Sequence, residues 1–188
     1  CVQLEAVTYI CQRFERPRLP DGSRPGFFLG DGAGVGKGRQ IAAVIYEHWL
    51  RGHKRAVWFS ASADLRYDAQ RDLEDIGAGD IPLHFDYPYG RLDNKKNGIT
   101  EGVLFCTFTM LLQAERKRNG NSRVDQLIQW MEEEDCPIIV FDEAHRAKNL
   151  VAESGTEPTK TGKAVLKLQQ DLPNAGVVYS SATGASEP

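Results

Sequence analysis

The glycine-rich segment Gly30–Arg39 constrains the fold of this chain more than any other stretch. It lies between the apolar run Phe27–Leu29 and a segment with helical apolar periodicity that begins at Ile41. Glycines allow consecutive backbone N–H groups to turn inward around an anion, and a following helix directs its unpaired N–H groups toward the same point. The order of strand, glycine loop and helix therefore predicts a binding site for nucleotide phosphates.

The loop is similar to the pattern G-x-x-x-x-G-K-[ST] but departs from it twice. Asp31 replaces the first glycine, and Gly38 replaces the hydroxyl residue that ligates magnesium, so that a water would have to complete the octahedron. Lys37 supplies a mobile charge for the β and γ phosphates. The alternative is a flexible glycine loop without a ligand. The residues that we expect to contact nucleotide are Gly32, Ala33, Gly34, Val35, Gly36, Lys37, Gly38 and Arg39.

A second polar motif, Asp142-Glu143-Ala144-His145, follows the apolar run Pro137–Phe141. Ligands of open α/β sheets gather at the carboxyl ends of strands. We expect Asp142 to hold Mg²⁺ and Glu143 to orient or deprotonate an attacking water. Acidic turns after strands are common, but the combination of this turn with an upstream glycine loop predicts hydrolysis of a nucleoside triphosphate.

Apolar runs and helical segments alternate along the whole chain, which is typical of right-handed βαβ units. We therefore expect an α/β fold with a mostly parallel sheet and helices on both faces. The length of 188 residues suits a single domain, 1–188. The runs that we expect to form strands are Phe27–Leu29, Ala56–Phe59, Gly102–Thr107, Pro137–Phe141 and Val177–Tyr179.

The composition is that of a soluble globular protein, with 41% hydrophobic and 26% charged residues. No apolar run approaches the roughly 20 residues that span a bilayer, so we expect no membrane contact. A net charge of −3 excludes a uniformly basic nucleic-acid binder but allows one positive face. The four cysteines form no C-x-x-C pair, and we interpret them as reduced thiols of an intracellular protein. We expect the scattered histidines to pack or to face solvent rather than to bind metal.

The motifs resemble the first RecA-like domain of superfamily 2 helicases, and they resemble the strawberry notch family more closely. The resemblance covers nearly the whole chain, and glycine after the loop lysine is normal for that family. Members often carry cysteine in place of Ala144, a change that we do not expect to disturb metal or water. The strings that carry the resemblance are Gly26–Arg39, Asp64–Ala69, Phe141–Leu150 and Ser181–Pro188.

This resemblance implies a RecA-like P-loop NTPase that uses ATP and Mg²⁺ and acts on DNA or chromatin in transcription, in the nucleus. It implies that Gln3 reads the adenine edge, although a solvated helix residue is the alternative. His145, Ser181 and Thr183 would couple hydrolysis to motion. The strand-end residues Ser60 and Thr107 would meet the nucleic-acid backbone.

The resemblance also implies a second RecA-like lobe that completes the active site and is absent from these 188 residues. We therefore expect the fragment to bind nucleotide but to hydrolyse it poorly. The competing hypothesis is a nucleotide-switched or catalytically weak module that recruits transcription or chromatin proteins. Gly38 favours that module, whereas the pair Asp142 and Glu143 favours the enzyme, because a scaffold has no chemical need for two such carboxylates.

Overall fold

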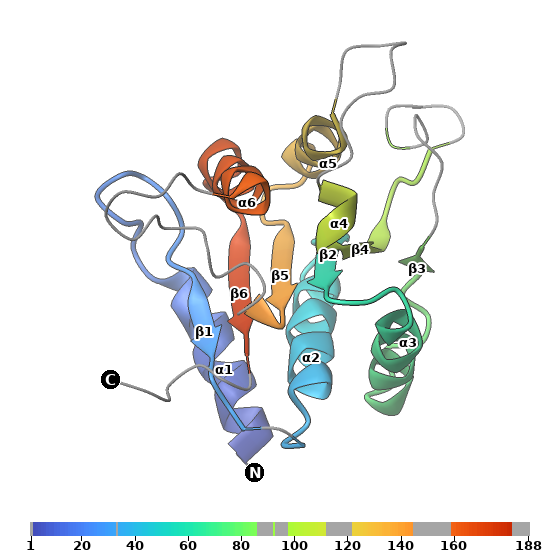
Figure 1. Ribbon diagram of the computed structural model, residues 1–188. Coiled ribbons are helices and arrows are strands. Elements are labelled where there is room, and N and C mark those ends of the chain that lie inside the picture. The colour runs from blue at the N-terminus through green and yellow to red at the C-terminus, as the bar shows by residue number, and fades with distance from the viewer. Residues whose placement is uncertain are drawn as a thin grey trace.

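The computed structural model of the chain describes residues 2–32, 34–85, 92, 98–111, 122–144 and 159–181. Strands and helices alternate along these residues (Figure 1). The elements are α1 (Val2–Glu15), β1 (Phe27–Leu29), α2 (Lys37–Leu50), β2 (Arg55–Ser60), α3 (Leu65–Asp75), β3 (Leu83–His84), β4 (Gly102–Thr107), α4 (Phe108–Leu111), α5 (Arg123–Glu132), β5 (Ile138–Asp142), α6 (Lys160–Asp171) and β6 (Gly176–Ser180).

The described strands form one six-stranded sheet in the order β1-β6-β5-β2-β4-β3, and every neighbouring pair is parallel. The strands that precede the glycine loop and the acidic motif thus do not neighbour each other directly, since β6 lies between β1 and β5. A parallel sheet needs a crossover between strands, and helices supply those from β1 to β2, β2 to β3, β4 to β5 and β5 to β6. The α/β fold with a mostly parallel sheet is confirmed.

Helices cover both faces of the sheet, as expected (Figure 1). Side chains alternate along each strand, so Trp58 and Val140 pack with α1, α2 and α3, whereas Phe59 and Phe141 pack with α4, α5 and α6. The rings of Phe59 and Phe141 stack with centroids 5.3 Å apart. Full burial of each such side chain contributes about 1.5–3 kcal/mol. The central strands are therefore held rigidly from both sides.

A capping box begins α5. The Ser122 hydroxyl accepts a bond from the Asp125 backbone N–H at 3.3 Å, and the Asp125 carboxylate accepts one from the Ser122 backbone N–H at 3.0 Å. The other Asp125 oxygen lies 2.8 Å from Nζ of Lys167 on α6. The start of α5 is thereby attached to its neighbour on the same face of the sheet.

Two short elements differ from the sequence expectation. The edge strand β3 has two residues, and α4 is a single turn that follows β4 directly. Neither element is long enough to show an apolar period, so the sequence pattern carries no signal for them. None of the helices in the described ranges has both the length and the apolarity that a membrane crossing requires.

Candidate nucleotide and cation site

The glycine loop leaves β1 and enters α2 through two residues with left-handed backbone. Gly34 has φ 80° and Gly36, which is the N-cap residue of α2, has φ 79°. No side chain caps this helix start, and the first turn of α2 contains no acidic residue. The unpaired N–H groups of the first turn are therefore available for an anion, which the helix dipole also favours.

The Lys37 ammonium group lies over the loop. Its Nζ donates to the backbone carbonyls of Asp31 at 2.9 Å and Gly32 at 2.8 Å. Both acceptors are neutral, and a hydrogen bond to a charged phosphate is roughly twice as strong as one to a neutral acceptor. A phosphate bound on this loop would therefore draw the ammonium group away from the carbonyls.

Gln3 reaches the same loop from α1. Its Nε2 donates to the backbone carbonyl of Val35 at 2.8 Å, and a Cβ added to Gly36 would lie 2.5 Å from that nitrogen. Two segments far apart in the sequence therefore meet at the helix start. The contact places Gln3 at the phosphate loop, while its role toward adenine stays a prediction.

Polar residues form a row across the carboxyl ends of four strands. Strand register pairs Ser60 with Thr107 and Asp142 with Ser180, and it pairs the residues that precede Ser60 and Asp142 with each other. Ser60 and Asp142 follow Trp58 and Val140 by two residues, so they lie on the α2 side of the sheet. The row thus faces the helix that begins at the glycine loop.

The row has unused hydrogen-bonding capacity. Ser60 and Ser180 are fully buried, and the Ser60 hydroxyl oxygen has no partner among the described residues, whereas the Ser180 hydroxyl and the Trp58 indole N–H interact with the Asp142 carboxyl. An unsatisfied buried polar group costs about 1–3 kcal/mol, so such groups normally bond water or a ligand. Donors and acceptors of this kind beside a carboxylate suit the waters around a hydrated cation.

Burial raises the pKa of the Asp142 carboxyl above its ordinary value, and the Glu143 carboxylate adds to that rise. Hydrogen bonds from the Ser180 hydroxyl, the Glu143 backbone N–H and the Trp58 indole oppose that rise, and the Glu143 nitrogen lies 3.0 Å from Asp142 Oδ1. A divalent cation next to Asp142 would oppose both causes of the raised pKa and favour the carboxylate. The residues present therefore fit a magnesium ion.

Glu143 has an unusual backbone. Its φ of 55° makes it the one non-glycine residue with positive φ in the described part of the chain. A left-handed backbone at a residue with a side chain costs about 1–3 kcal/mol and is concentrated at functional sites. The conformation turns the chain out of β5 and leaves the Glu143 side chain half-buried just beyond the row.

Gly38 and Arg39, the residues after the loop lysine, face α3. A Cβ on Gly38 would overlap Oδ2 of Asp72 and lie 2.9 Å from its Cγ. The Arg39 guanidinium bonds Asp75 at 2.6 Å, and its Nε lies 4.0 Å from Asp72. Arg39 is thus engaged with α3, and its contact with nucleotide stays a prediction. Neither aspartate is found by sequence reasoning, because their spacing matches no phosphate-loop pattern.

The remaining predicted residues divide into three groups. Ser181 is buried, and its N–H donates to the Leu29 carbonyl at 3.1 Å, which ties the end of β6 to the end of β1. Ser60 and Thr107 lie in the buried row, so direct contact with a nucleic-acid backbone is a prediction that the burial of Ser60 does not favour. Ala33, His145 and Thr183 lie outside the described residues.

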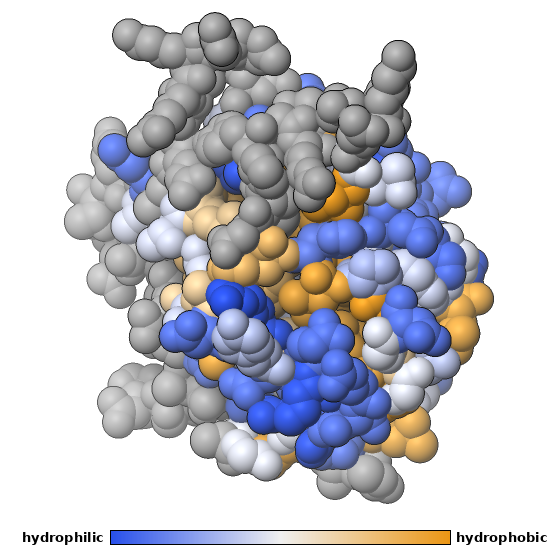
Figure 2. Space-filling model, turned by 90° about the vertical axis from the view of Figure 1, so that its right-hand side faces the viewer, coloured by the Kyte–Doolittle hydropathy of each residue, from blue (hydrophilic) through white to orange (hydrophobic). Residues whose placement is uncertain are grey.

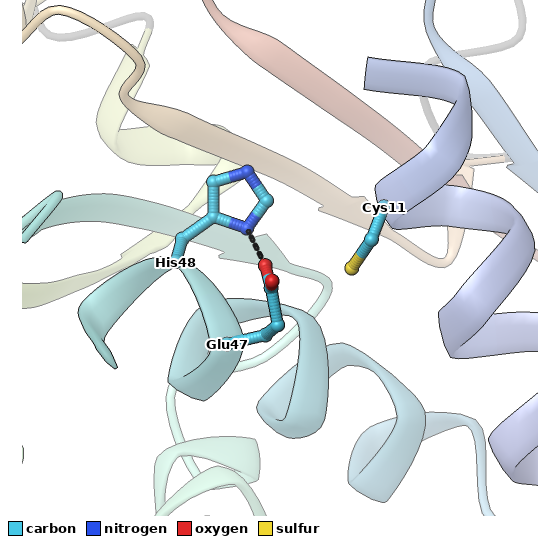
Figure 3. A group of neighbouring side chains, drawn as sticks. All are labelled: Cys11, Glu47 and His48. Atoms are coloured by element: carbon cyan, nitrogen blue, oxygen red, sulfur yellow. Dashed lines mark ion pairs between the residues drawn. The ribbon is translucent and has the colours of Figure 1, made fainter. Parts of the chain in front are cut away.

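A separate polar cluster contains Cys11, Glu47 and His48 (Figure 3), whose potential ligand atoms lie within 4.8 Å of one another. Glu47 and His48 are adjacent in the sequence, and only the packing of α1 on α2 brings Cys11 to them. His48 Nδ1 lies 3.0 Å from the Val44 carbonyl and 3.2 Å from Glu47, which also pairs with Arg51. Burial raises the pKa of the Cys11 thiol to about 12 and lowers that of His48. This pattern is a hydrogen-bonded contact that packs α1 on α2, which agrees with the expectation of packing.

Comparison with known proteins gives a full-length family match. The family model described as "P-loop containing NTP hydrolase pore-1" matches residues 1–188. The Caenorhabditis elegans "Protein strawberry notch homolog" is 52% identical over 193 residues, which cover 100% of this chain and 10% of the relative. The Gallus gallus "Protein strawberry notch homolog 1" is 54% identical over 192 residues, covering 100% and 15%. The Arabidopsis thaliana "Protein FORGETTER 1" is 51% identical over 191 residues, covering 100% and 14%. The chain thus spans only a small part of these relatives.

Solved structures with the same fold are more distant in sequence. The "Sulfolobus solfataricus SWI2/SNF2 ATPase core in complex with dsDNA" matches with a TM-score of 0.62 and 17% identity, over 97% of this chain and 31% of that one. The "ATP-dependent Type ISP restriction-modification enzyme LlaBIII bound to DNA" matches with a TM-score of 0.56 and 14% identity, over 95% and 12%. These similarities show a RecA-like P-loop NTPase fold.

Proposed function

Because the chain belongs to the family of the P-loop containing NTP hydrolase pore-1 and is homologous along its whole length to strawberry notch proteins, we infer that it is the ATP-binding lobe of a helicase-like ATPase. One observation carries the proposal. The start of α2 has left-handed glycines and no side-chain cap, and α2 covers the face of the sheet on which Asp142 lies at the end of β5, just before Glu143. That arrangement provides phosphate donors, a carboxylate for a cation and a carboxylate for water in one site.

The phosphates bind through the loop. The backbone N–H groups at the start of α2 donate to the phosphate oxygens, and Lys37 exchanges the two loop carbonyls for the β and γ phosphates. Gln3 holds the loop through the Val35 carbonyl and is positioned to contact the nucleotide base. These contacts are mostly to charged oxygens, so phosphate affinity is expected to dominate binding.

Asp142 would hold Mg²⁺, with Ser60 and Ser180 bonding the waters around it. When bound, the ion neutralises charge that develops on the phosphate oxygens. Glu143 orients the attacking water and takes its proton, since a carboxylate just outside the metal carboxylate can reach a water in line with the γ phosphate. The left-handed backbone of Glu143 would direct that side chain away from the buried row.

We expect nucleic acid, with DNA or chromatin foremost, to be the track of the complete protein. Two structures of the same fold were solved with DNA, and the relatives at 51–54% identity are mostly named strawberry notch proteins. A role in transcription, a location in the nucleus and contact with transcription or chromatin proteins rest on that kinship. A second RecA-like lobe would complete the site, so the 188 residues alone are expected to hydrolyse ATP poorly.

The competing function is an interaction module that binds nucleotide as a switch or turns it over weakly. Gly38 favours it, because this loop lacks the hydroxyl that ligates magnesium in most phosphate loops. In that case ATP would bind and change the affinity for transcription or chromatin proteins without DNA-stimulated hydrolysis.

Isothermal titration of ATP into the chain tests the binding step. Lys37→Ala should lower the affinity by at least about tenfold, because a hydrogen bond to a charged group contributes about 1.5–3 kcal/mol. Lys167→Ala, which removes the same charge from α6, is the matched control and should bind ATP as the unchanged chain does. Equal affinities for all three proteins would contradict the assignment of the loop.

Hydrolysis is tested in the protein that carries both lobes, with and without double-stranded DNA. Glu143→Gln should keep the ATP affinity and abolish turnover, because the amide cannot accept the proton of water. Turnover that rises with DNA supports the motor. Binding without turnover on DNA or RNA favours the interaction module, and an active Glu143→Gln protein would exclude the proposed role of that carboxylate.

A further inference from the structure

The space beside Gly38 is filled by a carboxylate from α3. A Cβ at position 38 would overlap Asp72 Oδ2, with Cγ at 2.9 Å and Oδ1 at 3.7 Å. In the common loop pattern this position carries a serine or threonine whose hydroxyl ligates magnesium. Here an oxygen atom from a different helix occupies the volume where the side chain of that residue would begin.

Among the described residues, no short ion pair holds this carboxylate. The Asp72 side chain is only 14% exposed, and its ion pair with Arg39 is long, at 4.0 Å. Arg39 is held instead by Asp75 at 2.6 Å. Burial raises the pKa of the Asp72 carboxyl, with Asp68 and Asp75 adding to the rise and Arg71 and Arg39 opposing it. A half-buried carboxylate of this kind is stabilised in its charged form when a cation binds next to it.

The polar groups at the strand ends also favour a bound cation. In the row that faces α2, the fully buried Ser60 hydroxyl lacks a partner within the described ranges, and the buried Ser180 hydroxyl interacts with Asp142. The hydrophilic surface of α3 lies on the side of the molecule seen in Figure 2, where blue side chains gather in its lower part. Asp72 differs from that surface because its side chain is only 14% exposed and approaches the first turn of α2.

We propose that Asp72 supplies the cation ligand that Gly38 lacks, directly or through a coordinated water, so that the divalent cation of this site is shared between Asp142 and Asp72. The proposal rests on the proposed ATP site. A carboxylate is a stronger ligand for Mg²⁺ than a neutral hydroxyl, but it also repels the phosphates when no cation is present. Nucleotide binding should therefore depend on the cation more steeply here than in a loop that uses serine or threonine.

The Asp72 carboxylate should favour ATP binding when the cation is present and oppose it when the cation is absent, and this difference provides the test. Mn²⁺ binding in the presence of ATP is followed by electron paramagnetic resonance, and ATP affinity is measured by calorimetry with Mg²⁺ and again with EDTA. In Asp72→Asn, Mn²⁺ affinity should fall by about ten- to a hundredfold, the range for loss of a partner around a metal site. ATP affinity in EDTA should stay the same or rise, because a repulsive charge has been removed.

Asp75→Asn is the matched control. It removes the short ion pair to Arg39 and the same charge from the same helix, and no contact of Asp75 with Gly38 is described. Its Mn²⁺ affinity should match that of the unchanged chain. If Asp72 only held α2 and α3 together, Asp72→Asn would lower ATP affinity in Mg²⁺ and in EDTA alike, and that result would overturn the proposal.

A rescue experiment guards against a variant that merely loosens the fold. Gly38→Ser alone places an atom on the Asp72 carboxylate and should weaken binding. Combined with Asp72→Ala, which clears that space, the serine hydroxyl should restore part of the Mn²⁺ affinity that Asp72→Ala loses. A double variant no better than Asp72→Ala also contradicts the proposal. Failure of the unchanged chain to bind ATP at all would instead refute the proposed function.

Discussion

Replacement of Gly36 by alanine tests the loop geometry most directly. Gly36 combines φ 79° with a close approach to Gln3, whose Nε2 would lie 2.5 Å from the new methyl group. A left-handed backbone costs an alanine about 1–2 kcal/mol, and displacing Gln3 removes a hydrogen bond that contributes about 1 kcal/mol. We therefore expect the free energy of unfolding to fall by about 2–3 kcal/mol. In a domain of this length that lowers Tm by about 4–12 °C.

The same loop offers two controls. Gly34 also has positive φ but open space around its Cβ position, so Gly34→Ala should show the backbone cost alone. Gly32 has open space and no left-handed φ, so Gly32→Ala should leave the stability nearly unchanged. Thermal and urea unfolding of the three variants, with ATP titrations, measure the series.

The expected order of destabilisation is therefore Gly36, Gly34, Gly32. ATP affinity of Gly36→Ala should fall by about ten- to a hundredfold, because at least one charged hydrogen bond to the phosphates loses its geometry. Combining Gly36→Ala with Gln3→Ala should remove the steric part of the cost. Equal unfolding free energies for the three alanine variants would refute the argument from loop geometry.

Two further predictions concern stability away from the site. Ser122→Ala should lower the free energy of unfolding by about 1 kcal/mol in urea denaturation, through loss of the α5 capping box, whereas Ser62→Ala, whose hydroxyl accepts only a 3.4 Å bond, should have little effect; equal losses would contradict the cap. Burial lowers the pKa of His48; the Val44 carbonyl and Glu47 oppose this shift, and His53 and Arg51 add to it. As the pH falls, the His48 imidazole is therefore protonated at a higher pH in the unfolded chain than in the folded one. The contribution of neutral His48 to stability is then complete above about pH 6.5 and is lost as the pH falls below that value. His48→Asn should therefore flatten the decline of the urea midpoint between about pH 7.5 and 5.5. An unchanged slope would contradict the assignment.

The central part of the fold could be predicted because its signals are local. Continuous apolar runs mark β4 and β5, since strands covered on both faces carry no polar side. The motifs at the ends of β1 and β5 were predictable for the same reason, because residue type and position next to a strand suffice. The order of the strands was not, since it depends on how separate βαβ units pack, which no local pattern encodes.

The missing part of the site illustrates the same limit. Asp72 lies on α3, whose largely polar sequence predicts a solvent-exposed helix. Its contact with Gly38 arises from the packing of α3 on α2. The sequence marks the departure at Gly38 but not its partner. Likewise, Cys11 and His48 are far apart in the chain, and only the contact between α1 and α2 brings their side chains together.

The row Thr107, Ser60, Asp142 and Ser180 makes the function of this protein sensitive to the length of its strands. Side chains alternate between the faces of a strand, so inserting one residue within β2 or β5 would move Ser60 or Asp142 to the side of α5 and α6. Such an insertion would bury a charge in an apolar layer and remove the site in the same step. Insertions beyond the strand ends carry no such penalty, because they leave the alternation of side chains within each strand unchanged.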